Sequence, residues 1–159
     1  TRRGRYTAVP PLRPVSNGKN YFWLNCSITS DDLTALQAKA KKCGVSLNDV
    51  FMTAYVRVIA RLQHINKVVI PCPADLRRFQ SEPDHLTIAN MRLYFKNIDV
   101  VSCSLAGTFR LPPYFQLTIS TFRDVCTFNC TLAGSAGDEI IGQQILEQVK
   151  SELLAWLTE

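Results

Sequence analysis

The sequence predicts an α/β (α+β) fold in which helices pack on one face of a mixed β-sheet. Strand-like and helix-like apolar patterns alternate through the first half of the 159-residue chain, and hairpin-like runs follow in the second half. The composition, 47% hydrophobic and 19% charged, is that of an ordinary globular domain. We therefore expect a single lobe over residues 20–159, preceded by an extended, proline-rich crossing segment over residues 1–19.

The first expected element is a strand over residues 21–28, which is rich in aromatic side chains and bounded by turn residues. Thr29 and Asp32 then have the spacing of a capping box, so a helix should begin there. Its apolar positions recur at helical spacing and should be buried: Leu33, Leu36, Ala40 and Cys43. Gly44 supplies the residue type that ends helices.

A second helix should begin at Ser46, because Asp49 follows at capping-box spacing. Apolar residues form a continuous stripe along it, and Met52, Val56 and Ala60 make its opposite side apolar as well. We expect this helix to be largely buried. The stripe consists of Leu47, Val50, Phe51, Ala54, Tyr55, Val58, Ile59 and Leu62.

Further strands are expected over residues 67–72, 91–95, 100–105, 115–121 and 126–132, with a short helix or turn over 75–79. Asp138 is expected to cap a last helix. The buried face of that helix should consist of Ile140, Ile141, Ile145, Val149, Leu153 and Trp156.

The net charge of +5 does not indicate a nucleic-acid binder, because the basic residues beyond the first five positions are scattered. An acidic ligand, such as coenzyme A or a phosphopantetheine carrier, stays compatible with this surface. The six cysteines form no CxxC pair and no zinc spacing, which predicts free thiols, no metal and a cytoplasmic location. No apolar run is long enough to span a membrane, and the start without Met suggests that an upstream segment is missing.

Three segments, in this order, resemble the acyltransferase superfamily that includes chloramphenicol acetyltransferase, condensation domains and alcohol acetyltransferases. Residues 38–50 (AKAKKCGVSLNDV) are similar to its passage of helix, Gly-Val-Thr and long buried helix. Residues 68–78 (VVIPCPADLRR) and 88–90 (IAN) resemble its strand, Asp-x-Arg turn and Gly-Asn element, with Ala89 in place of Gly. Residues 101–107 (VSCSLAG) look like its Ser-Asn-x-Gly strand, with Cys103 in place of Asn.

The resemblance implies the C-terminal lobe of a two-lobed acyltransferase, a chloramphenicol-acetyltransferase-like half whose missing N-terminal lobe closes a substrate tunnel. The family's base lies in a His-His-x-x-x-Asp motif of that other lobe, and this chain has only the isolated His64 and His85. We therefore expect no catalytic residue in this chain, and inactivity of the chain alone. The implied donor is an acyl-CoA or acyl-phosphopantetheine thioester, the acceptor is a small molecule, and the exposed lobe interface should favour homo-oligomers.

By the same resemblance, Asp75 and Arg77 would form an ion pair that buttresses the site, the alternative being a solvated surface turn. Asn90 would offer its amide to the substrate tunnel, unless it is an ordinary turn residue. Ser102 and Ser104 share one side of the expected strand and would donate to an oxyanion, the alternative being a plain polar sheet face. A degenerate, non-catalytic binding module of the same fold is the alternative function.

Overall fold

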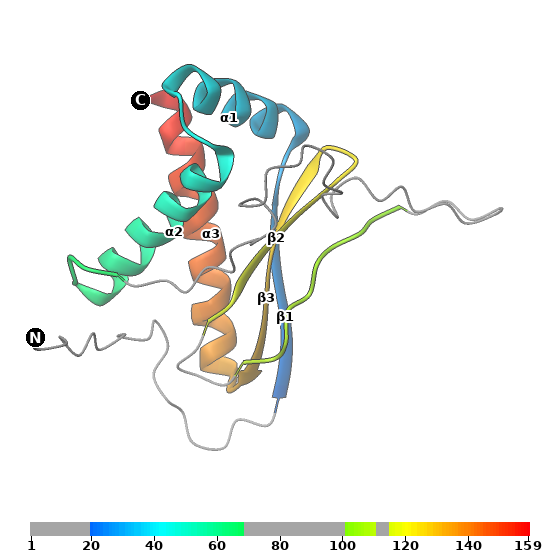
Figure 1. The fold of residues 1–159 in the computed structure, drawn as a ribbon. Coiled ribbons are helices and arrows are strands. Elements are labelled where there is room, and N and C mark those ends of the chain that lie inside the picture. Colours follow the sequence, from blue (N-terminus) through cyan, green and yellow to red (C-terminus); the bar gives the residue numbers. More distant parts are fainter. Residues whose placement is uncertain (1–19, 69–100, 111–114) are drawn as a thin grey trace, which may run out of the picture.

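The computed structural model describes residues 20–68, 101–110 and 115–159 (Figure 1). Within them the chain forms a three-stranded sheet and three helices. The elements follow the order β1 (Asn20–Ile28), α1 (Ser30–Cys43), α2 (Leu47–Gln63), β2 (Leu117–Phe122), β3 (Val125–Gly134) and α3 (Ala136–Thr158). The predicted α/β class is confirmed.

The sheet has the order β1-β3-β2, and both ladders are antiparallel. β3 is the central strand: nearly its whole length pairs with β1, and its first half pairs with β2. A mixed sheet was the expectation, and in the described ranges the one parallel contact is an isolated bridge from Arg110 to Leu132. β2 and β3 are joined by a two-residue turn, Arg123-Asp124, in which both residues have positive φ, as in a type I′ hairpin.

The three helices cover one face of the sheet, as expected (Figure 1). α3 lies directly on β1 and β3, while α2 packs on α3 and α1 crosses near one end. Strand alternation supplies the apolar face that they cover, because Cys126, Phe128, Cys130 and Leu132 of β3 are all buried.

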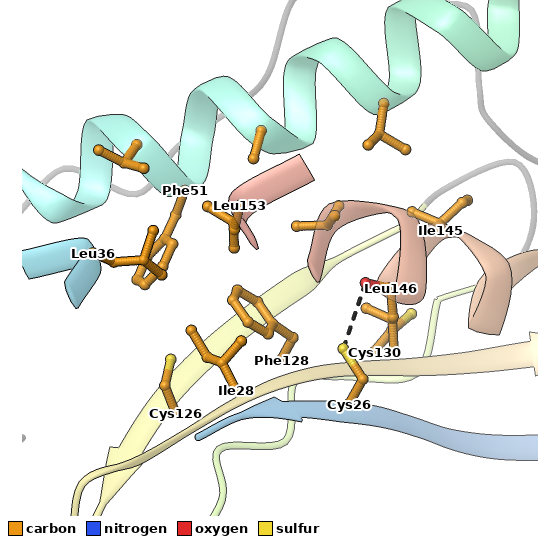
Figure 2. Packing of buried hydrophobic residues seen from close by; sticks show 14 of the residues in the cluster. Cys26, Ile28, Leu36, Phe51, Cys126, Phe128, Cys130, Ile145, Leu146 and Leu153 are labelled. Carbon is orange, nitrogen blue, oxygen red and sulfur yellow. Dashed lines mark hydrogen bonds between the residues drawn. The ribbon is translucent and has the colours of Figure 1, made fainter. Parts of the chain in front are cut away.

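The core forms where these strand side chains meet the helices (Figure 2). Phe51 of α2 reaches Phe128 edge-on, with ring centroids 5.5 Å apart. The Cys26 thiol donates to the Leu146 carbonyl of α3 at 3.4 Å (Figure 2). Apolar burial of this extent is the main stabilising contribution to a small domain.

The first two helices begin where the cap residues predict. The Thr29 hydroxyl accepts from the Asp32 N–H, and Ser46 and Asp49 form a complete capping box. Gly44 ends α1 in the left-handed conformation, at φ 69°. Cys43 was expected to be buried and is instead exposed, because it is the last residue of α1 and lies beyond Ala40, the last buried residue of the helix.

The second helix is less buried than expected. One stripe of α2 is in the core, namely Val50, Phe51, Ala54, Val58 and Ile59. The opposite positions Met52, Val56 and Ala60 are only half-buried, and Leu62 is exposed. The reason is that α2 packs on α3 in the outer part of the helical layer, where one side of a helix meets few neighbours.

The start of the third helix also requires a correction. Ser135, not Asp138, is its N-cap, and Asp138 is the third helical residue, whose carboxylate accepts from the Ser135 N–H at 2.8 Å. Ile145, Val149 and Leu153 are fully buried as expected, and Trp156 is half-buried. Ile140 and Ile141 are exposed, because Gly142, Ile145 and Leu146 occupy the side of the first turns that meets the sheet.

Some expected elements fall outside the described residues: the strand over 91–95, the turn over 75–79 and most of the strand over 67–72. Lys67 and Val68 are described and are not in a strand. The strand expected over 100–105 is wrong for its described part, since residues 101–105 are irregular.

Candidate functional site

Two of the residues proposed for the site are described, Ser102 and Ser104. Asp75, Arg77 and Asn90 lie outside the described residues. Ser102 is exposed and Ser104 is half-buried, in the irregular chain that runs through residues 101–110. The structure therefore brings neither serine into a strand, and the expected common strand face does not exist.

Residues 105–108 are held against the sheet by side-chain hydroxyl groups. The Leu105 N–H donates to Ser120 Oγ at 3.2 Å, and Thr118 Oγ1 donates to the Leu105 carbonyl at 2.8 Å. Further along, Thr131 Oγ1 lies 3.0 Å from the carbonyl oxygens of both Gly107 and Thr108. These contacts are made by side chains, and backbone pairing with β3 occurs only further along, at Arg110.

Those hydroxyl groups belong to the sheet face opposite the helices, which we call the outer face. It is formed by alternate residues of the three strands: Tyr21, Trp23, Asn25 and Ser27 of β1, Thr118, Ser120 and Phe122 of β2, and Val125, Thr127, Asn129, Thr131 and Ala133 of β3. Polar side chains pair across it. The Trp23 indole N–H donates to Asn129 Oδ1 at 3.2 Å, and the hydroxyls of Ser27 and Thr127 are 3.2 Å apart.

Aromatic side chains at one end of the outer face are exposed to solvent. Tyr21 is 70% exposed, Trp23 57% and Phe109 52%. The rings of Tyr21 and Phe109 meet edge-on, with centroids 5.0 Å apart. Asn129, by contrast, is fully buried beneath this surface and its side chain is hydrogen-bonded. The outer face thus combines hydrogen-bonded polar side chains with exposed aromatic rings that a partner or ligand can cover.

The described residues of the outer face provide hydroxyl, amide and indole donors but no imidazole. His64 lies elsewhere, at the C-cap of α2 with φ 53°. The buried cysteines are unsuited as nucleophiles, because burial raises the pKa of the Cys26 thiol to about 11 and that of Cys130 to about 12. In the ranges that the structure describes, no three metal-ligating side chains gather, and no helix has the length and apolarity needed to cross a bilayer.

Sequence reasoning missed a second feature, a half-open pocket between α2 and α3 whose lining includes Arg57 and Glu152. Glu152 forms ion pairs with both Arg57 and Arg61. The four-residue spacing of the two arginines places them on one side of α2, which the sequence shows. Their shared carboxylate comes from another helix, so the sequence alone does not reveal it.

Comparison of the chain with known proteins finds no matching family model, no matching curated protein and no matching solved structure.

Proposed function

We propose that this chain is the C-terminal lobe of a thioester-dependent acyltransferase and forms one wall of its substrate tunnel. The supporting observation is the attachment of residues 105–108 to the outer face. This attachment puts the VSCSLAG segment, which resembles the family's Ser-Asn-x-Gly element, beside a row of hydroxyl groups and next to exposed aromatic rings.

Acyl transfer from a thioester requires two kinds of protein group. A base accepts the proton of the acceptor hydroxyl or amine as it attacks the thioester carbonyl, and donors stabilise the oxyanion until the carbon–sulfur bond breaks and the thiol leaves. The described residues of the outer face offer hydroxyl, amide and indole donors and no imidazole, and Ser104 lies in the adjoining irregular segment. The base is proposed to be the second histidine of a His-His-x-x-x-Asp motif in the N-terminal lobe.

The test is to measure transfer by this chain with and without its N-terminal lobe. The natural protein that contains the chain would be expressed in full, and acyl transfer from acetyl-CoA and octanoyl-CoA to a panel of alcohols and amines would be followed by mass spectrometry. We expect turnover by the full protein, none by this chain alone, and none after the second histidine is replaced by alanine. Turnover by the isolated chain, or a full protein without the histidine motif, would contradict the proposal.

One observation favours the alternative, a non-catalytic binding module of the same fold. The residue at the family's asparagine position is Cys103, which is exposed and cannot donate as an amide does. Such a module would bind a phosphopantetheine carrier protein through its outer face without consuming the thioester. Binding of an acyl carrier that leaves the acyl group intact in the full protein would support this alternative over the enzyme.

A further inference from the structure

The part of the outer face along β1 is open to solvent and carries two aromatic side chains and an amide in a row. Tyr21, Trp23 and Asn25 alternate along β1, so they point to the same side of the sheet. All three are exposed, and neighbouring members of the row are about 7 Å apart along the strand. We call this row of three residues the open strip.

Both aromatic rings of the open strip are held in position by neighbouring residues. The indole N–H of Trp23 donates to Oδ1 of the fully buried Asn129 at 3.2 Å, yet Trp23 is 57% exposed. This bond anchors one edge of the ring and leaves ring surface for a ligand. The Tyr21 ring meets Phe109 edge-on, with centroids 5.0 Å apart. The orientation of this aromatic surface is therefore set before a ligand arrives, which lowers the entropic cost of binding.

Two polar groups of the open strip have free hydrogen-bonding capacity. Among the described residues, none forms a hydrogen bond with the side-chain amide of Asn25 or with the hydroxyl of Tyr21. Only the backbone carbonyl of Asn25 is engaged, because it accepts from Gln143 Nε2 at 3.2 Å. An amide and a phenolic hydroxyl each donate and accept. They flank Trp23 along the strand, so a ligand that stacks on the Trp23 ring finds a hydrogen-bonding group at either end.

None of the strand residues that form the outer face is charged. Charged residues of the described segments adjoin this face only outside the open strip. Arg110 donates to Gln116 Oε1 at 3.1 Å. Arg123 and Asp124 form the hairpin turn, at the end of the sheet remote from Tyr21. An anion or a cation on the open strip would therefore lose hydration without gaining a counter-charge, which favours a neutral ligand.

A sugar combines the properties that the open strip selects. It is neutral, its hydroxyl groups donate and accept, and the C–H groups on one face of a pyranose ring can lie against an aromatic ring. We infer that the open strip binds a sugar of one or two pyranose rings, and that this sugar is the acyl acceptor of the proposed enzyme. One ring stacks on Trp23, and its hydroxyl groups bond to Asn25 and Tyr21.

The acceptor role rests on the function proposed above, whereas sugar binding does not. In the transfer step, a free hydroxyl oxygen of the sugar attacks the thioester carbonyl and its proton passes to the base of the N-terminal lobe. The new carbon–oxygen bond forms, the carbon–sulfur bond breaks, and the thiol leaves. The product is a sugar ester.

Binding is tested on this chain with methyl β-cellobioside as the probe and the Trp23 indole N–H as the reporter. In proton–nitrogen correlation spectra the chain has two indole signals, which a Trp156→Phe variant assigns. At a protein concentration where dilution no longer changes the spectrum, we expect a saturable shift of the Trp23 signal with a dissociation constant of about 10 mM or tighter. Trp156 packs on the core at the helical side and should not shift. Sorbitol has hydroxyl groups but no ring to stack, so it should bind about fivefold more weakly.

Three variants test the hydrogen-bonding groups of the open strip. Asn25→Ala should weaken methyl β-cellobioside about five- to tenfold, because it removes an amide that bonds to the sugar. Tyr21→Phe retains the ring and loses the hydroxyl, and should weaken the probe about two- to fivefold. Asn48→Ala is the matched control, since it removes the same side chain from an exposed position of α2 and should not change the affinity. An unchanged Trp156 signal shows that each variant is folded.

The acceptor role is tested with the full protein that contains this chain. Acetyl transfer from acetyl-CoA to methyl β-cellobioside and to sorbitol would be followed by mass spectrometry. We expect kcat/KM to be about tenfold higher for methyl β-cellobioside, because only this acceptor stacks on Trp23. Asn25→Ala should narrow this preference, and Asn48→Ala should retain it.

The two experiments distinguish failure of the sugar site from failure of the proposed function. An unshifted Trp23 signal, equal affinity for methyl β-cellobioside and sorbitol, or an Asn25→Ala variant that binds as well as Asn48→Ala would overturn the sugar site. If the full protein then still acylates simple alcohols, the acyltransferase proposal stands without this inference. Sugar binding by the chain, with no acyl transfer by the full protein to any acceptor, would instead overturn the proposed function and the acceptor role together.

Discussion

At the scale of single residues, the described cysteines divide into two groups by exposure. Cys43 and Cys103 are exposed, whereas Cys26, Cys126 and Cys130 are buried on the helical face of the sheet. Burial raises the pKa of each of these three thiols, which also keeps them protonated at neutral pH. Thiolate is the reactive form of cysteine, so burial and protonation both lower the reactivity of these three thiols.

We therefore predict selective alkylation of this chain by iodoacetamide at about pH 7.5. Cys43 and Cys103 should be modified within minutes, and the three buried thiols should be modified only as the domain unfolds. Peptide mass spectrometry after timed quenching gives the rate at each position. Addition of denaturant is the control, under which all of these rates should converge. A buried thiol that reacts as fast as Cys43 in the native protein would contradict the packing described here.

The raised pKa of Cys26 also predicts a loss of stability at alkaline pH. Desolvation is the main cause of the shift, followed by the negative charge of Glu147, and together they take the pKa from 9.0 to about 11. Between these two values the unfolded chain releases its proton and the folded chain retains it, so the free energy of unfolding falls as the pH rises. The stabilisation is complete below pH 9 and is lost by about pH 11.

Urea unfolding at several pH values from about 8 to about 11 measures this effect. Cys26→Ala should be less stable than the native chain at the lowest pH, because it loses packing and the hydrogen bond to Leu146, but its stability should fall less steeply with pH. Cys43→Ala changes an exposed thiol and should retain the native pH slope. Equal slopes for the native chain and Cys26→Ala would show that Cys26 does not contribute.

At the scale of elements, a substitution in the turn between β2 and β3 should increase the stability of the domain. Arg123 has φ 47° and Asp124 has φ 65°, a conformation that favours glycine at the second position of a two-residue hairpin. Asp124→Gly should raise the free energy of unfolding by about 0.5 to 1 kcal/mol, and Asp124→Ala should lower it. Thermal unfolding measures the stability of both variants. An alanine variant as stable as the glycine variant would show that the positive φ of residue 124 does not strain the backbone.

The contact between α3 and β1 depends on the absence of a side chain at Gly142. A Cβ there would lie 2.5 Å from a terminal methyl group of the buried Leu24. Gly142→Ala should therefore destabilise the domain by about 1 kcal/mol, since overpacking outweighs the gain in helix propensity.

Gly137 in the first turn of the same helix provides the matched control. A Cβ there approaches nothing closer than 3.6 Å, so Gly137→Ala should leave stability unchanged or raise it. Denaturant unfolding of both variants is the measurement. A Gly142→Ala variant as stable as Gly137→Ala would show that Leu24 can move aside without cost.

The same helix shows which parts of the fold were predictable. Ser135 and Asp138 have the same spacing as Ser46 and Asp49, so the local sequence contains the capping box of α3. The prediction named Asp138 as the cap, which is the wrong one of the two residues. Local signals of this kind act over one helical turn. The exposure of Ile140 and Ile141 depends instead on how the first turn of α3 is oriented on the sheet, which no local pattern specifies.

The candidate site was less predictable than the elements around it. The alternating pattern of residues 101–105 predicted a strand. In the structure, the adjoining residues 105–108 are held by hydroxyl groups of β2 and β3. Hydrogen bonds from side chains far along the sequence leave no local signature, and here Thr118 and Thr131 provide them. The Arg57–Glu152 contact was inaccessible for the same reason, because its partners are far apart in the sequence.

At the scale of the whole molecule, the two faces of the sheet differ in their exposure to solvent. Helices cover one face, whereas Tyr21, Trp23 and Phe109 leave aromatic surface exposed at one end of the other. Contiguous apolar surface on a globular domain is typical of a place where another surface packs. If the proposed N-terminal lobe covers this surface in the full protein, its removal should leave the isolated chain prone to pair with itself.

We therefore predict reversible self-association of the isolated chain, measured by sedimentation velocity over a roughly hundredfold concentration range. Tyr21→Ser should shift the equilibrium toward monomer, because Tyr21 is the most exposed of the three aromatic side chains and packs edge-on with Phe109. Ile140→Ser removes a comparably exposed apolar side chain, 59% exposed on α3, and should leave the equilibrium unchanged. A clean monomer at all concentrations, or an equal effect of both substitutions, would mean that the outer face is not an interface and would weaken the case for a missing lobe.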